Sequence, residues 1–126
     1  MKRKVRPMSI IYKKAAIEYF LWEASYSAQT GRRAIDKGDI IYVIGSLYKA
    51  ANALAQVVYA MNGEYILNEK GCFSKMVHFK HVPKDFIKNM QSIFLSIDLT
   101  NMPNAYEIID FYVNDLRQMI QQLNLY

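Results

Sequence analysis

The hydrophobic positions of this chain recur every three to four residues in four long segments, and none of these segments shows the period of two that marks a strand. The first segment runs from about Ser9 to Thr30, and we expect Gly31 to end it. Its apolar row consists of Ile10, Ile17, Leu21, Ala24 and Ala28. Residues 32–38 are rich in charge and form the expected connection to the next helix.

The second segment is the most apolar of the four. Asp39 is its expected N-cap, and Asn62–Gly63 is a typical C-terminal stop. Its apolar positions form two neighbouring rows: Ile40, Val43, Leu47, Ala50, Leu54, Val57 and Met61, and beside them Ile44, Tyr48, Ala51, Ala55 and Val58. A helix that is apolar over so much of its circumference is predicted to be the central one.

Two further helices are predicted in the second half of the chain. The third starts at Pro83, which suits a first helical turn, and buries Phe86 or Ile87, Met90, Ile93, Phe94 and Ile97. The fourth follows Pro103 and buries Ala105, Ile108, Ile109, Tyr112, Leu116, Met119 and Leu123. A short helix from Glu69 to Val77, capped by Asn68, is expected between the second and third. The predicted fold is all-α: an antiparallel up-and-down bundle of four long helices plus this short helix.

Length and composition favour one soluble domain. A chain of 126 residues is sufficient for a single domain, and 52% apolar with 21% charged residues is typical of a globular core. No uninterrupted apolar run approaches ~18 residues, so we expect no membrane span. Cys72 is the single cysteine, which excludes an internal disulfide framework. We expect residues 9–126 to form one cytoplasmic helical domain.

The net charge of +5 is concentrated at the N-terminus. Residues 1–14 carry six basic and no acidic side chains, whereas residues 15–126 carry ten basic and eleven acidic ones. We interpret residues 1–8 as a basic leader or the remnant of a linker, with an arm that contacts phosphate or RNA as the alternative. Because a nucleic-acid surface is expected as a basic stripe on the folded domain, nucleic acid is not an expected partner.

The usual catalytic signatures are missing from the sequence. It has no Walker loop, nucleotide-binding glycine fingerprint, His-Glu-x-x-His motif or nucleophile elbow. His78 and His81 could share a helical face, but no further ligands are suitably spaced, so no metal site is predicted. Cys72 has no obvious activating base and is expected to be a packing residue or an inert thiol.

Two polar features remain as candidates for function. The first is a stripe on the second helix, which is either its solvent side or the wall of a cleft: Asp39, Tyr42, Ser46, Lys49 and Gln56. The second is the segment from Asn62 to Gly71, with two amides, two carboxylates, a phenol and an ammonium. Such groups suit a ligand with hydroxyls or amines, because carboxylates pair with amines and amides bridge hydroxyls. The alternative is a polar turn whose asparagines cap the neighbouring helices.

Around these residues the sequence resembles a known family. The matching stretches are Gly38-Asp39-x-x-Tyr42-Val43-x-Gly45, Leu54-x-Gln56-Val57-Val58-Tyr59-Ala60-Met61-Asn62, Tyr65-x-x-Asn68-Glu69-Lys70-Gly71 and Phe79-Lys80-His81-Val82-Pro83-Lys84-Asp85-Phe86. Together they resemble the helical, HEPN-like C-terminal domain of bacterial minimal-fold nucleotidyltransferases, which include aminoglycoside and lincosamide nucleotidyltransferases. The resemblance extends from about Trp22 to Leu116.

The resemblance implies a division of labour between two domains. In that family an α/β domain carries the Gly-Ser and Asp-x-Asp elements that bind metal and nucleotide, and the helical domain closes over the acceptor substrate. This sequence has no Asp-x-Asp pair, so it is expected to bind an acceptor without being catalytic on its own. Nucleoside triphosphate and Mg would belong to the missing catalytic domain, and we expect no cofactor on this chain. The expected partners are that domain or subunit, a small-molecule acceptor and a second copy of the chain.

The resemblance also supplies the alternative, a freestanding HEPN-like interaction module that is dimeric or paired with a separate nucleotidyltransferase. Some HEPN domains are ribonucleases and carry an arginine four to six residues before a histidine. Here Arg33 precedes His78 by forty-five residues, so ribonuclease activity is not expected.

The predicted acceptor site combines the end of the polar stripe with the segment after it. Asp39 and Gln56 are separated by about 25 Å along a helix, so only the C-terminal part of the stripe can contribute. The predicted substrate-binding residues are Lys49, Gln56, Glu64, Tyr65 and Lys70. Glu69 is the candidate catalytic residue, which would pair an acceptor amine or polarise its hydroxyl. The alternative is that Glu69 and Lys70 only begin the short helix.

Overall fold

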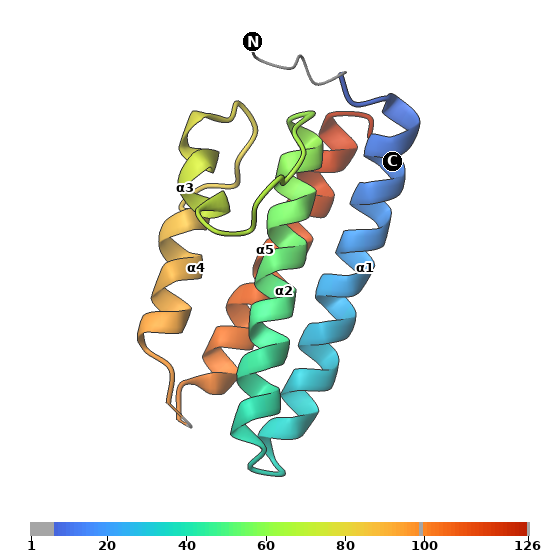
Figure 1. Ribbon diagram of the computed structural model, residues 1–126. Coiled ribbons are helices and arrows are strands. Elements are labelled where there is room, and N and C mark those ends of the chain that lie inside the picture. The colour runs from blue at the N-terminus through green and yellow to red at the C-terminus, as the bar shows by residue number, and fades with distance from the viewer. Residues whose placement is uncertain (1–6, 99, 126) are drawn as a thin grey trace.

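A computed structural model describes residues 7–98 and 100–125, which contain helices and no strands. The helices are α1 (Ile10–Ile35), α2 (Ile40–Met61), α3 (Cys72–Lys75), α4 (Phe86–Leu95) and α5 (Met102–Gln122), with a 3-10 turn at Met76–His78 (Figure 1). The predicted all-α class is confirmed. Four basic residues of the predicted leader lie outside the described residues: Lys2, Arg3, Lys4 and Arg6.

The helices α1 and α2 form a hairpin and share the most extensive packing in the fold. Helix α5 packs against both and lies behind them in Figure 1, whereas α4 packs against α5. Helix α4 has only ten residues, so α1, α2 and α5 are the long helices of the described chain. The up-and-down topology of four long helices is therefore not confirmed and stays a prediction.

Capping residues begin and end the hairpin helices at the expected places. The Ser9 side chain accepts a hydrogen bond from the backbone N–H of Tyr12, 3.1 Å away, at the start of α1. The Asp39 carboxylate accepts one from the N–H of Tyr42 at the start of α2. Gly63, with φ of 70°, follows Asn62 at the end of α2. The predicted cap at Asp39 and the predicted stop at Asn62–Gly63 are confirmed, because each depends on residues within one turn.

The prediction that Gly31 ends the first helix is wrong. Helix α1 continues to Ile35, and Gly31 is buried within it. A Cβ atom at this position would overlap the Tyr106 hydroxyl and lie 2.7 Å from Cβ of Ser46. Glycine is therefore needed here for the close approach of α2 and α5 to α1, and not as a stop signal.

The short helix after α2 also differs from the expectation. It begins at Cys72 instead of Glu69, directly after Gly71 with φ of 77°. The Asn68 side chain accepts a hydrogen bond from the N–H of Lys70 and so forms a local turn instead of a helix cap. Glu69 and Lys70 precede the helix, so they do not begin it.

The last two helices are shifted from their predicted starts by a few residues. Helix α4 begins at Phe86, because Pro83 to Phe86 first form a turn in which the Phe86 N–H donates to the Pro83 carbonyl. Asp85, at its start, has a left-handed φ of 59°. Helix α5 begins at Met102, with Pro103 inside its first turn.

The core is formed largely by the predicted apolar rows, with α2 at its centre. Ile10, Ile40 and Tyr48 are exceptions, because they are exposed. Two buried tyrosines hold α5 in place. The Tyr106 hydroxyl donates to the Val43 carbonyl, and the Tyr112 hydroxyl donates to the Lys84 carbonyl at 2.9 Å.

Helix α2 is long and apolar enough to cross a membrane by length and composition, and half of its most apolar stretch is buried inside the protein. A core helix of a soluble protein has the same properties. The absence of a membrane span and the cytoplasmic location therefore stay predictions.

Buried Tyr106 is expected to make the fold sensitive to alkaline pH. The pKa of Tyr106 is raised from an ordinary value of 10.0 to about 12, and burial is the main cause. Between these values the unfolded chain loses this proton and the folded chain retains it, so stability falls as the pH rises. The loss should begin near the lower value and reach about 2 kcal/mol at the upper one.

Thermal melts followed by circular dichroism over this pH range measure the effect. Tyr106→Phe should flatten the decline without abolishing it, because burial also raises the pKa of Tyr59 and Tyr112. The same decline in the variant as in the parent protein would contradict the prediction.

Candidate functional site

Two hollows lie along the seam between α1 and α2. The larger, about 460 Å³, is called the aromatic groove, and the residues that line it include Tyr19, Trp22, Tyr26, Tyr42, Gly45 and Lys49. The smaller, about 150 Å³, is called the tyrosine pocket, and the residues that line it include Tyr12, Phe20, Gln56, Glu64 and Tyr65. Four residues of the predicted polar stripe line these hollows: Tyr42, Ser46, Lys49 and Gln56.

The α1 side of the aromatic groove is a row of aromatic rings. Tyr19, Trp22 and Tyr26 are spaced by three and four residues and therefore share one face of the helix. The rings of Trp22 and Tyr26 are nearly parallel, at 12°, with centroids 5.1 Å apart. Their exposed fractions are 57% and 51%, so this stacked pair is a projecting, apolar surface.

The base of the aromatic groove is open at Gly45. A Cβ added there would meet no atom within 4 Å, and the residue has no left-handed φ. Glycine in a helix interior costs about 0.5–1 kcal/mol relative to alanine, yet neither packing nor backbone conformation requires it here. The missing side chain instead leaves a recess. Ser27 and Ser46 lie in the same groove and are the buried polar residues of the described chain.

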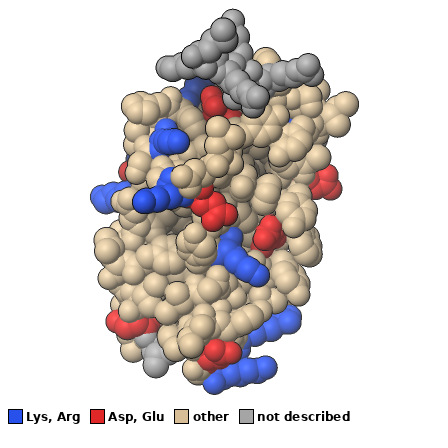
Figure 2. Space-filling model, in the orientation of Figure 1, with Lys and Arg blue, Asp and Glu red and all other residues tan. Residues whose placement is uncertain are grey.

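The aromatic groove contains one acidic and one basic side chain, Glu23 and Lys49. Among residues 7–98 and 100–125 there is one ion pair. It lies between Arg32 and Asp110, at 2.6 Å, and joins α1 to α5. Glu23 and Lys49 thus make no ion pair with each other or with another described residue. Figure 2 shows charges of both signs scattered over the visible face, with broad uncharged areas between them and no basic stripe.

The tyrosine pocket lies at the other end of the seam, where α2 ends. The rings of Tyr12 and Tyr65 are 5.4 Å apart and come from α1 and from the loop after α2. Gln56 and Glu64 line the same hollow. The structure thus brings together three of the predicted site residues. Met8, assigned to the leader from the sequence, also lines this pocket.

The other three predicted residues lie elsewhere. Lys49 lines the aromatic groove, two helical turns from Gln56. Glu69 and Lys70 are exposed in the turn before α3 and are not among the residues that line the tyrosine pocket. Burial, together with the Glu69 carboxylate, raises the pKa of the Cys72 thiol, which makes this buried thiol unreactive.

Asn62, part of the polar segment after α2, has a structural role. Its amide nitrogen donates to the carbonyls of Val58 and His81, each at 2.7 Å, and its amide oxygen accepts from the His81 N–H at 2.9 Å. The side chain therefore attaches the loop that precedes α4 to the end of α2. Because its groups are satisfied within the protein, Asn62 is not a candidate ligand contact.

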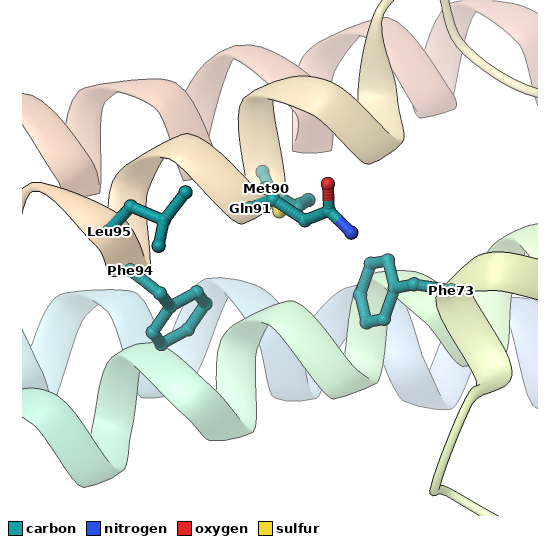
Figure 3. Close-up of a pocket in the computed structure, with 5 residues that line it drawn as sticks. All are labelled: Phe73, Met90, Gln91, Phe94 and Leu95. Carbon is teal, nitrogen blue, oxygen red and sulfur yellow. The ribbon is translucent and has the colours of Figure 1, made fainter.

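A third hollow, about 530 Å³, is apolar and lies on α4. Figure 3 shows Phe73 and Phe94 at its two ends, with Met90 and Gln91 between them. No charged residue lines it, so it offers no group for acid–base chemistry. Among the described residues no group of three or more His, Cys, Asp or Glu side chains is placed to hold a metal ion.

The sequence contained a signal for the aromatic row that the prediction did not use. Trp22 and Tyr26 follow Tyr19 at helical spacing, but only the aliphatic row beside them was assigned a role. Comparisons with protein-family models, with curated proteins and with solved structures found no match. The motif resemblance to nucleotidyltransferases therefore stays a prediction.

Proposed function

We propose that this chain is the acceptor-binding helical domain of a nucleotidyltransferase and acts with a separate α/β catalytic domain. The observation that carries the proposal is the meeting of Gln56, Glu64 and Tyr65 in the tyrosine pocket. Gln56 and Tyr65 belong to two different stretches of the family resemblance, and Glu64 lies between those stretches.

The chemistry of the tyrosine pocket suits one ring of a polyhydroxylated or aminated acceptor. The Glu64 carboxylate pairs with an amine, and the Gln56 amide bridges hydroxyls. Tyr12 and Tyr65 offer ring faces for the apolar side of the ligand. At about 150 Å³ the pocket is smaller than the ~300–1,000 Å³ of most ligand sites, so a catalytic domain would cover the rest of the acceptor.

The remaining predicted residues complete the proposal. Glu69 acts as the catalytic carboxylate on the acceptor group, and Lys70 and Lys49 bind parts of the acceptor outside the pocket. Nucleoside triphosphate and Mg bind to the catalytic domain and not to this chain. The purified chain is therefore expected neither to consume nucleoside triphosphate nor to cut RNA.

Calorimetric titration of the purified chain with an aminoglycoside and with a lincosamide tests the proposal. We expect saturable binding of one of them, weakened about tenfold by Glu64→Gln because the charge-assisted hydrogen bond is lost. Glu107→Gln is the matched control, since Glu107 is an exposed carboxylate on α5 away from the pocket. No binding of either compound, or equal losses in both variants, would refute the proposed site.

The second candidate is the freestanding helical interaction module, dimeric or paired with a separate nucleotidyltransferase. The observation that favours it is the aromatic row of α1, which is exposed along the seam. An acceptor titration without binding, combined with a stable dimer, would favour this candidate over the first.

A further inference from the structure

The aromatic groove has two nearly buried hydroxyl groups in its lining. Ser27 and Ser46 are each 6% exposed, and no hydrogen bond among the described residues uses either hydroxyl. A hydroxyl sealed in the core without a partner would be an unsatisfied buried group, and the described part of the chain contains none. Both hydroxyls are therefore open to the groove. Because they are shielded from most water, a ligand atom that bonds to them gains more than it would on an exposed surface.

The packing of the hairpin determines which residues lie level with one another along the groove. Gly31 of α1 lies against Ser46 of α2. Counted from this contact along two antiparallel helices, Lys49 lies within about 2 Å of the level of Ser27, and Ser46 lies about 5 Å nearer the turn that joins the helices. Two hydroxyls and one ammonium group thus meet in the middle of the groove. Glu23 lies about 7 Å further along α1 than Lys49.

The groups in the middle of the groove are hydrogen-bond donors. A lysine ammonium group can only donate, and each serine hydroxyl can donate one bond. Lys49 makes no ion pair with another described residue, so its charge is available to a ligand. Donors around a cation suit an oxyanion, and a single cation matches a single negative charge. The middle of the groove therefore suits a carboxylate.

The α1 wall beside these donors offers flat ring faces. Tyr26 is the sequence neighbour of Ser27, and its ring stacks on the ring of Trp22 at an angle of 12°. Both rings are more than half exposed. Parallel offset stacking of aromatic rings is favourable, so a third ring can extend this stack. A planar ligand can thus lie along the wall while its acidic group reaches the donors.

The α2 wall provides the space for such a ligand. Gly45 adjoins Ser46, and the position of its missing side chain is open. The groove has a volume of about 460 Å³, within the ~300–1,000 Å³ that is usual for small-molecule sites. Such sites combine apolar and aromatic walls with a few polar groups that converge on one point. The aromatic groove has the same combination.

We infer that the aromatic groove binds a free planar aromatic carboxylate, with its ring on the Trp22–Tyr26 stack and its carboxylate between Lys49 and the two serine hydroxyls. This site goes beyond the proposed function, because the aromatic groove is separate from the tyrosine pocket. Lys49 is the one residue that the two proposals share, so the variants below also include positions that only the groove uses.

Calorimetric titration of the full chain with naphthoate, a planar two-ring carboxylate, tests the inference. We expect saturable binding of one molecule per chain. Naphthamide keeps the rings and lacks the charge, and cyclohexanecarboxylate keeps the charge and lacks the flat face. Each should bind at least about tenfold more weakly than naphthoate. Trp22 is the single tryptophan, so its emission should change as naphthoate binds.

Three variants separate the contributions to binding. Lys49→Gln should weaken naphthoate binding about tenfold and leave naphthamide binding unchanged, because only the charge is lost. Gly45→Leu fills the recess and should weaken both probes, while helix content should not fall, since leucine is a strong helix former. Ser46→Ala should weaken naphthoate binding severalfold. Lys88→Gln is the matched control, because Lys88 is an exposed lysine on α4 and does not line the groove.

Three outcomes would overturn the inference. The first is the absence of naphthoate binding. The second is equal binding by the parent protein, Lys49→Gln and Gly45→Leu. The third is equal affinity for naphthoate and naphthamide, which would show that the groove does not select a carboxylate.

Acceptor titrations keep this inference apart from the proposed function. Gly45→Leu and Ser46→Ala do not touch the tyrosine pocket, so acceptor affinity should be unchanged in both variants. Naphthoate binding without acceptor binding would support the aromatic-carboxylate site and refute the proposed function. Acceptor binding without naphthoate binding would do the reverse.

Discussion

Gly31→Ala is expected to destabilise the protein by about 2–3 kcal/mol, although alanine is the better helix former. The added methyl would overlap the Tyr106 hydroxyl and lie 2.8 Å from Cζ of Tyr106. The Tyr106 ring is fully buried and bonded to Val43, so it has no room to withdraw. Urea denaturation followed by circular dichroism measures the loss.

The matched control is Gly45→Ala, the same change in the interior of α2. There the methyl meets no atom within 4 Å, so the helix-propensity gain of about 0.5–1 kcal/mol should remain. The two substitutions should thus have opposite signs. Tyr106→Phe removes the hydroxyl and should recover part of the loss in a Gly31→Ala background. A stabilised Gly31→Ala protein would show that α5 does not approach α1 so closely.

The second large effect is expected for Asn62→Ala, which should lower the free energy of unfolding by about 2–3 kcal/mol. It removes three hydrogen bonds, and each is worth roughly 0.5–1.5 kcal/mol. The loop at His81 then loses its attachment to α2. Denaturation measures the stability, and hydrogen exchange at the His81 amide should become faster.

Asn68→Ala is the comparison in the same connection between α2 and α4. Asn68 is exposed, and its side chain accepts a hydrogen bond from a backbone N–H only two residues away. The substitution should therefore lower the free energy of unfolding by about 0.5 kcal/mol. Equal losses in the two variants would contradict the structural role of Asn62. A weakened acceptor affinity in Asn62→Ala would report this loosened loop and not a direct ligand contact.

Local features of the fold were predictable from the sequence because their causes are local. The predicted cap at Asp39 acts within one helical turn, and the apolar rows of α2 repeat at the helical period. Gly31 was misinterpreted because the residue that requires it, Tyr106, is seventy-five positions away. The predicted start of the third helix at Pro83 is too early. That prediction did not take account of Asp85, whose left-handed φ separates the preceding turn from α4.

The candidate site was predictable only in part, for a geometric reason. Gln56 and Lys49 belong to the polar stripe and therefore share one face of α2. They are seven residues apart, however, which is about 10 Å along the helix, and they line different hollows. Tyr12 was missed because it lies at the opposite end of the hairpin sequence from Tyr65, and only the fold brings their rings together.

The turn between α1 and α2 also has a consequence for the order of folding. It joins Ile35 to Ile40, so the two helices with the most extensive packing are neighbours in sequence. Closing so short a loop costs little entropy, whereas docking α5 closes a much longer one. We therefore expect the hairpin to form during synthesis, before Tyr106 is made. The gap beside Gly31 would then stay hydrated until α5 docks and its hydroxyl replaces that water.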